Sequence, residues 1–165
     1  MTRYVLPDLR YDYGALEPHI SGTIMELHHD KHRAGYVEGA NDTLEQLDEA
    51  RQKGDLSRLA ALERALAFNV SGHVLHSAFW QNLTPKGSDS PTGSLAETIQ
   101  RDFGSFAQLR RQLTHVTSTI MESGWAALVW EPLRGLLTTQ IHDHQSNLSQ
   151  GGMPLFLLDA WEHAF

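Results

Sequence analysis

The fold of the first half of this chain is decided by residues 21–51, SGTIMELHHDKHRAGYVEGANDTLEQLDEAR. Between Ile24 and Leu47 the apolar side chains recur at spacings of three and four, which is the period of an amphipathic helix. Ser21 is suited to cap the start of that helix. Because Gly and Asn in its middle weaken a helix, we expect a kink or break near residues 39–42.

A second helical run follows over residues 56–80, after the turn signal Lys-Gly-Asp at 53–55. Two long helices joined by a short turn form an antiparallel hairpin. We therefore predict a helical hairpin domain over residues 1–83. The Pro-, Gly- and Ser-rich residues 84–93, TPKGSDSPTG, are predicted to be a linker, and residues 94–165 a second domain.

The second half combines helices with short strands. Two helices are predicted over 95–103 and 106–120, separated by Gly104 and with Ser105 as the N-cap of the second. Three apolar segments with a shorter period then follow, at 125–130, 136–142 and 153–159. The first two are predicted to pair as a hairpin. The fold class is therefore α+β, with a small three-stranded antiparallel sheet after the helices.

The composition restricts the chemistry. The 165 residues contain 13 Lys+Arg, 20 Asp+Glu, ten His and no Cys, for a net charge of −7. The acidic balance argues against a nucleic-acid partner. Without thiols, a transition metal would be bound through nitrogen and oxygen. No apolar stretch is long enough for a secretory signal or a membrane span, so we expect a cytoplasmic protein without a membrane partner.

Two groups of histidines fall on the predicted hairpin. His28, His32 and Tyr36 are four residues apart, so their side chains share one helix face. For a bare pair of histidines at this spacing, a polar stripe on a solvated helix is the favoured interpretation. His73 and His76 lie three apart on the second helix, where contact between helices with one hydrogen-bonded core histidine is favoured.

A third group follows the last predicted strand. Asp159 comes directly after an apolar run, and His163 follows four residues later. A helix-capping aspartate and a ligand at a strand end are equally good interpretations of this pattern. One histidine from each hairpin helix, together with this pair, would make a set of three imidazoles and one carboxylate. Such a set suits iron, manganese or zinc with an open position.

Five motifs occur in a characteristic order: Tyr4-Val-Leu-Pro-Asp-Leu, Leu27-His-His-Asp-Lys-His32 with Tyr36, Asn69-Val-Ser-Gly-His-Val-Leu-His76, Gly124-Trp125-Ala and Asp159-Ala-Trp-Glu-His-Ala-Phe165. With these motifs the chain resembles the iron/manganese superoxide dismutases, and is most similar to their actinobacterial members. The resemblance covers essentially the whole chain. It implies a homo-oligomeric antioxidant oxidoreductase that disproportionates superoxide to dioxygen and hydrogen peroxide through M(III)/M(II) cycling.

The resemblance also implies roles for individual residues. One iron or manganese ion per chain, with iron favoured, would be bound by His28, His76, Asp159 and His163. His32 and Tyr36 would flank the path of the substrate, and His144 would be the donor to metal-bound solvent, since Gly72 stands where one subgroup of the family has that donor as Gln. Around them the resemblance places an apolar wall of Trp80, Trp125 and Trp161, and a Glu162 that reaches the metal-ligand histidine of a partner subunit in a homodimer or dimer of dimers.

The chain departs from the family at its end. Family members continue beyond the position of Phe165 for a few dozen residues, so we expect a chain truncated at the C-terminus, or a shortened relative. Two other functions stay open: another oxygen-dependent metalloenzyme on the same scaffold, and a non-catalytic dismutase-like structural subunit. Because superoxide is an anion and the chain is acidic, Lys31 or Arg33 is expected to steer it locally.

Overall fold

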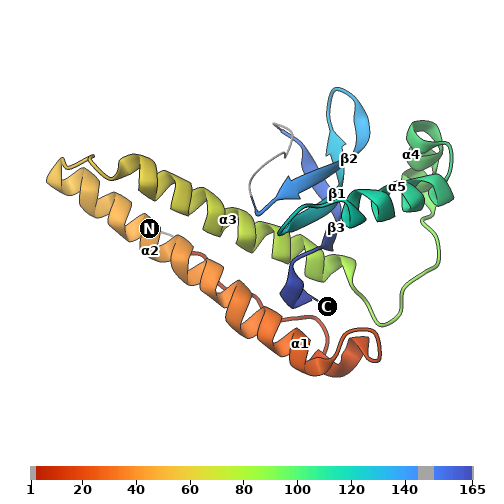
Figure 1. The fold of residues 1–165 in the computed structure, drawn as a ribbon, viewed down its shortest axis with the longest axis horizontal. Coiled ribbons are helices and arrows are strands. Elements are labelled where there is room, and N and C mark those ends of the chain that lie inside the picture. Colours follow the sequence, from red (N-terminus) through yellow and green to blue (C-terminus); the bar gives the residue numbers. More distant parts are fainter. Residues whose placement is uncertain (1–2, 145–150, 165) are drawn as a thin grey trace. The chain divides into compact units, whose positions relative to one another are not determined.

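The computed structural model describes residues 3–144 and 151–164. The chain divides into two compact units, Met1–Ser77 and Ala78–Phe165. Helices come first and a three-stranded antiparallel sheet follows, so the predicted α+β class is confirmed (Figure 1). Neither helix nor strand lies between Asn82 and Gly93. The proposed domain limits, 1–83 and 94–165, stay a prediction.

The first unit is built around a helical hairpin, as predicted. Its elements are η1 (Tyr13–Leu16), α1 (Gly22–Leu27), the π-helical segment η2 (His28–Arg33), α2 (Ala34–Lys53) and most of α3 (Leu59–Asn82). Ser21 caps α1, because its side chain accepts a hydrogen bond from the backbone N–H of Ile24 at 3.2 Å. Gly54 ends α2 with a φ of 66°, a left-handed conformation that glycine adopts without strain.

The expected break near residues 39–42 is wrong, because α2 continues through them. The irregular turn lies earlier, in the π-helical segment. Gly39 lies in close contact with α3, since a Cβ there would lie 2.7 Å from Oδ1 of Asn69 and would force that side chain to move. Asn41 is held by the N-terminal arm: its side chain accepts from the backbone N–H of Tyr4 at 2.9 Å and donates to its carbonyl at 3.0 Å. Tertiary contacts thus override the weak local propensity.

Gly72 lets α3 approach α2 closely, as the small residues there predict. A Cβ at this position would lie 2.8 Å from Cγ of Tyr36 and 2.9 Å from one Cδ. Separations that short do not occur between carbon atoms in contact. The position of the Tyr36 ring therefore depends on the absence of a side chain at residue 72.

We expect Gly72→Ala to destabilise the protein by about 1–3 kcal/mol, because the tyrosine ring must be displaced. Gly35→Ala is the matched control, since it also lies in a helix and a Cβ there meets nothing within 4 Å. The control should be neutral or stabilising by up to about 1 kcal/mol from helix propensity alone. Urea unfolding of both variants measures the difference. An equal gain in stability in both would show that the close contact is not rigid.

The second unit places two helices against the sheet. Its elements, after the end of α3, are α4 (Gly93–Phe103), α5 (Phe106–Ser118), β1 (Gly124–Glu131), β2 (Gly135–His142), β3 (Met153–Asp159) and η3 (Glu162–Ala164). Gly104, with a φ of 79°, separates the two helices, and the Ser105 side chain accepts from the backbone N–H of Gln108. Both predictions for this junction are confirmed.

Strand β1 is the centre of the sheet, which has the order β2-β1-β3. It pairs antiparallel with β2 from Gly124 opposite His142 to Glu131 opposite Gly135, and antiparallel with β3 from Trp125 opposite Asp159. The core beneath the helices consists of Ile99, Leu109, Leu113, Leu128 and Leu136. Its burial explains the continuous apolar run of β1, and the pairing of β1 with β3 fixes where Asp159 ends the sheet.

None of the helices in the described part of the chain combines the length and the apolar character needed to cross a bilayer.

Candidate metal centre

Two of the predicted ligands face each other in the first unit. His28, at the start of η2, and His76, in α3, have their Nε2 atoms 2.9 Å apart. Their rings are nearly perpendicular, at 86°, with centroids 4.9 Å apart. Both side chains are almost fully buried, with exposed fractions of 1% and 0%. Two ring nitrogens so close together in the interior form a ready donor pair for a cation.

The tautomer of His76 is set by a backbone carbonyl. Its Nδ1 lies 2.7 Å from the carbonyl oxygen of Gly72. Because a carbonyl only accepts, Nδ1 carries the proton and donates it, which leaves the lone pair of Nε2 directed toward His28. A hydrogen bond of this kind orients histidines that bind metals and raises their basicity. His76 is therefore both a hydrogen-bonded core histidine and a preoriented donor.

His32 and Tyr36 lie beside this pair, as their spacing predicts. The rings of His28 and His32 are 6.3 Å apart, and those of Tyr36 and His76 are 5.2 Å apart. His32 is exposed, whereas Tyr36 is half-buried. The π-helical segment carries both histidines, and such widened turns occur preferentially at functional sites. A path of polar groups thus leads from solvent to the buried pair.

The second unit brings Asp159 and His163 together where β3 ends. A carboxylate oxygen of the one and a ring nitrogen of the other lie within 4.8 Å. Asp159 Oδ1 also accepts from the backbone N–H of Trp161 at 2.9 Å, so it caps the turn into η3. The two interpretations of this aspartate are compatible, because a carboxylate has two oxygens and the capping bond to Trp161 uses only Oδ1.

His144 is buried between two tryptophans of the same unit. Its Nδ1 accepts the indole N–H of Trp125 at 3.0 Å, so in the neutral ring Nε2 carries the proton and can donate. Its ring stacks on Trp161, with centroids 4.6 Å apart and an angle of 13°. Burial lowers the pKa of His144 to about 4, and the charge of Asp143 opposes this shift only weakly. The ring is therefore a neutral, oriented donor at physiological pH.

This burial makes the stability of the protein depend on pH. In the unfolded chain His144 titrates near 6.5, so between about pH 4 and 6.5 the unfolded state binds more protons than the folded one. The stabilisation that the lowered pKa of His144 gives the folded state is complete above pH 6.5 and disappears as the pH falls to 4. Its size is on the order of 2–3 kcal/mol. Comparing urea unfolding of the unmodified chain and His144→Gln between pH 4 and 7 isolates it. A pH-independent difference between the two would contradict the assignment.

Aromatic contacts connect the predicted tryptophan wall within the second unit. The ring of Phe79 lies 5.0 Å from Trp80 and 5.7 Å from Trp125. Trp80 and Trp125 are buried, at 5% and 0% exposure. Sequence reasoning missed Phe79, whose only signal was its position beside Trp80. Glu162 is exposed in η3, one residue after Trp161.

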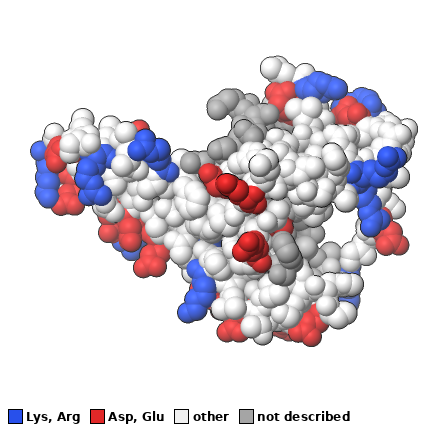
Figure 2. Space-filling model, viewed as in Figure 1, with Lys and Arg blue, Asp and Glu red and all other residues white. Residues whose placement is uncertain are grey.

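The expectation that Arg33 could steer an anionic substrate from the surface is wrong. Its exposed fraction is 3%, so it cannot act as a solvent-facing guide for an anion, while Lys31 is exposed. Basic side chains at the turn between α2 and α3 are paired, Arg51 with Asp48 and Lys53 with Glu49. Figure 2 shows blue and red atoms intermixed at that end of the hairpin, so local fields cancel there.

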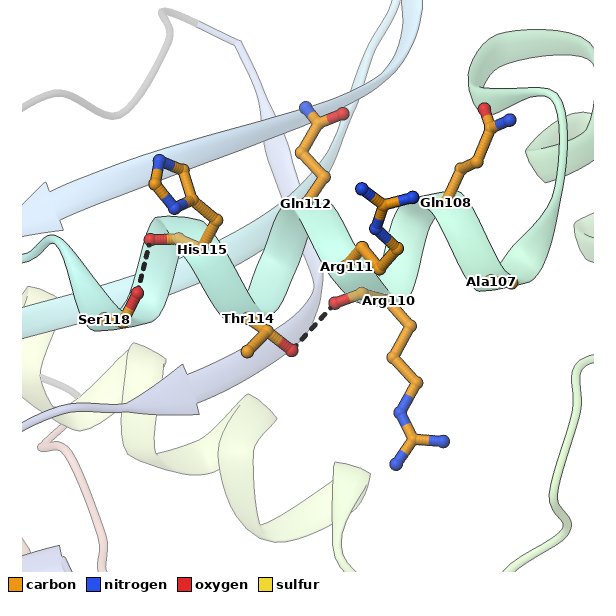
Figure 3. A pocket seen from close by; sticks show the side chains of 8 residues that line it. All are labelled: Ala107, Gln108, Arg110, Arg111, Gln112, Thr114, His115 and Ser118. Carbon is orange, nitrogen blue, oxygen red and sulfur yellow. Dashed lines mark hydrogen bonds between the residues drawn. The ribbon is translucent and has the colours of Figure 1, made fainter.

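A hollow of about 930 Å³ lies along α5, and its lining includes none of the predicted ligands (Figure 3). Arg110, Arg111 and His115 are among the side chains that line it. Its hydroxyls are used within the helix, since Thr114 donates to the carbonyl of Arg110 and Ser118 to that of His115. His115 itself is exposed on α5.

The fold and the donors define a class of protein: an α+β metalloprotein with a helical hairpin and nitrogen and oxygen ligands. The family model for the α-hairpin domain of iron/manganese superoxide dismutases matches residues 3–84, and the model for their C-terminal domain matches residues 91–165. The chain belongs to the iron/manganese superoxide dismutase family. It is accordingly an enzyme that disproportionates superoxide.

Similar proteins come from actinobacteria, which confirms the resemblance. A superoxide dismutase [Fe] of Mycobacterium tuberculosis is 55% identical, over 100% of this chain and 80% of that protein. A superoxide dismutase [Mn/Fe] of Propionibacterium freudenreichii subsp. shermanii is 54% identical, over 98% and 82%. A superoxide dismutase [Mn] of Mycolicibacterium smegmatis is 52% identical, over 100% and 80%. The metal therefore varies among relatives of nearly equal similarity.

Proposed function

We propose that the enzyme disproportionates superoxide at one iron or manganese ion bound by His28, His76, Asp159 and His163. The observation that carries the proposal is the buried pair of histidine nitrogens in the first unit, 2.9 Å apart, with one tautomer fixed by a carbonyl. The second unit would supply the carboxylate and the third imidazole. One ion would then require both units of the chain.

The donor set fits such an ion. Ring nitrogens bind divalent metals at about 2.0–2.1 Å, so a single ion can contact two nitrogens that are 2.9 Å apart. Three imidazoles and a carboxylate suit iron and manganese. The single negative charge of this donor set, on the carboxylate, favours binding of the trivalent ion. Without an ion, one of the two facing nitrogens must be protonated for the pair to be favourable. With it, both lone pairs are used.

Iron or manganese would supply one-electron chemistry, alternating between M(III) and M(II), so that one superoxide is oxidised to dioxygen and the next is reduced. The reduction consumes two protons to form hydrogen peroxide. Tyr36 and His32 would deliver them, a role supported by the half-buried Tyr36 ring beside His76 and by the exposure of His32 to solvent. His144 would hold and orient solvent at the centre through its Nε2–H, with Trp125 fixing that tautomer.

Three further roles belong to the same proposal. Trp80, Trp125 and Trp161 would exclude water around the centre, which strengthens the electrostatic interactions within it. Glu162, exposed beside His163, would reach a second copy of the chain in a homodimer or dimer of dimers, which analytical ultracentrifugation of the Glu162→Gln variant would test. We favour iron, and a cytoplasmic location stays a prediction from the sequence.

Metal analysis coupled to a superoxide consumption assay on the purified protein tests the proposal. We expect one redox metal per chain and fast disproportionation that is lost with a chelator and restored with iron or manganese. A bound metal without this activity would favour a different oxygen-dependent metalloenzyme. A protein that binds no metal would favour a structural role.

A further inference from the structure

Arg33 is a buried cation in the first unit. It is the last residue of the π-helical segment, and only 3% of it is exposed. Burial lowers the pKa of Arg33, but an arginine stays charged at neutral pH. Placing an uncompensated charge in the interior costs several kcal/mol, which is why buried arginines are paired with an anionic group.

No carboxylate within residues 3–144 and 151–164 compensates this charge. Among the side chains that the structure describes, the one to which Arg33 donates a hydrogen bond is Ser77, whose Oγ accepts from Nη2 at 2.9 Å. Its Nε is buried and has no acceptor among those residues. A guanidinium has five N–H donors in a planar fork, and in Arg33 one of them, Nε–H, is buried without a partner in the described part of the chain.

A second buried nitrogen atom without a partner among the described residues, which donates in one of the two neutral tautomers of its ring, belongs to α3. Nδ1 of His73 is buried and has no hydrogen-bond partner in the described part of the chain. Burial lowers the pKa of His73, and the charge of Arg33 lowers it further. The hydroxyl of Ser77 joins them, since it accepts from Arg33 and donates to the backbone carbonyl of His73 at 2.7 Å.

The cluster therefore carries a buried positive charge and a buried N–H of Arg33 that lacks an acceptor among the described residues. The hydroxyl of Ser77 already accepts one hydrogen bond and donates another, whereas Nε of Arg33 and Nδ1 of His73 have no hydrogen-bond partner among the described residues. A ligand that satisfies it must bring acceptor atoms and negative charge. The planar fork of arginine matches the two oxygens of a carboxylate in a bidentate arrangement, which spherical ions do not provide.

We propose that Arg33, His73 and Ser77 form a carboxylate-binding site inside the first unit, distinct from the metal ligands. The carboxylate comes from a small free anion such as formate or from an acidic side chain of a second copy of the chain. In either case it neutralises the buried guanidinium and ties the segment that carries His28 to α3. The inference does not depend on the proposed metal site.

Formate is the probe, and the matched variant is Arg33→Met, which keeps the length of the side chain but removes its charge and donors. Thermal unfolding of the metal-loaded enzyme is followed while formate replaces chloride at constant ionic strength. We expect saturating formate to raise the Tm of the unmodified enzyme by about 3–6 °C and that of Arg33→Met by none. Arg33→Lys, which keeps the charge without the fork, should gain less than half as much.

The source of the carboxylate is resolved by protein concentration. If a second copy supplies it, the stability advantage of Arg33 over Met should grow across a hundredfold range of protein concentration, and formate should compete with association. If a free anion supplies it, the advantage should depend on formate and not on protein concentration. Formate bound at the metal would raise the Tm of both proteins equally. Only the difference between their two Tm shifts is therefore attributed to Arg33.

Two results would overturn the proposal. One is an equal response of the unmodified enzyme and Arg33→Met to formate and to protein concentration. The other is a higher Tm for Arg33→Met in every condition, as expected when an uncompensated buried charge is removed. Should Arg33→Met fail to fold, saturation-transfer NMR of formate with the unmodified enzyme and with Ser77→Ala decides the question. Binding should weaken several-fold in Ser77→Ala, and no binding to either protein would also overturn it.

Discussion

His76→Ala is expected to lose its metal and at least about 100-fold of its superoxide dismutase activity. Removing even a hydrogen-bond partner of a metal-binding histidine costs 10–100-fold in affinity or activity, and removing the ligand itself costs more. The substitution also leaves the buried Nε2 of His28 without the nitrogen that lies 2.9 Å away. Metal content per chain by mass spectrometry, together with a stopped-flow superoxide assay, measures both losses.

The matched control is His115→Ala, which removes an exposed histidine from α5. It should retain the metal and the full rate. A His76→Ala protein that folds and keeps one metal per chain would refute the assignment of this ligand. Circular dichroism of both variants establishes that the hairpin is intact, so that a loss of metal is not a loss of fold.

Asp159→Asn is expected to fold normally and to lose most of its metal. Asparagine keeps an oxygen that can accept from the backbone N–H of Trp161, so the turn into η3 is preserved. What it removes is the one negative charge among the proposed ligands, and a neutral amide binds a trivalent ion far more weakly than a carboxylate does. We expect metal content and activity to fall together by about 10-fold or more.

Asp89→Asn is the control, because this carboxylate is exposed in the segment between α3 and α4. It should change neither metal content nor rate. Since Asp159 and His76 belong to different units, loss of the ion in both variants is expected only if one ion needs both units. If Asp159→Asn kept a full complement of metal, the carboxylate would act only as a turn cap.

Much of the fold could be predicted from local patterns. The hairpin helices, the junction at Gly104 and the three strands follow from apolar spacing, from capping residues and from glycine, all of which act over a few residues. The break expected near residues 39–42 was wrong for the same reason. Whether Gly39 breaks a helix or admits a neighbour depends on Asn69, which is 30 residues away in the sequence.

The residue types of the candidate site could be predicted from the sequence, but the tautomers and protonation states of its histidines could not. The spacing of His28, His32 and Tyr36 put them on one face, and in the structure the rings of His28 and Tyr36 contact His76, while that of His32 lies beside His28. That His76 presents Nε2, and that His144 is neutral with its proton on Nε2, depends on the carbonyl of Gly72 and the indole of Trp125. No spacing rule encodes which atom a buried ring will meet.

By itself, the sequence determined the order of helices and strands, the donors available for a metal and the family to which the chain belongs. Only the tertiary structure decided that α2 is continuous, that the irregular turn lies at His28–Arg33, and that Arg33 is buried rather than a surface charge. The physical reason is one of range. Propensity and periodicity act between near neighbours, whereas burial, tautomer and charge compensation are set by groups that folding brings together.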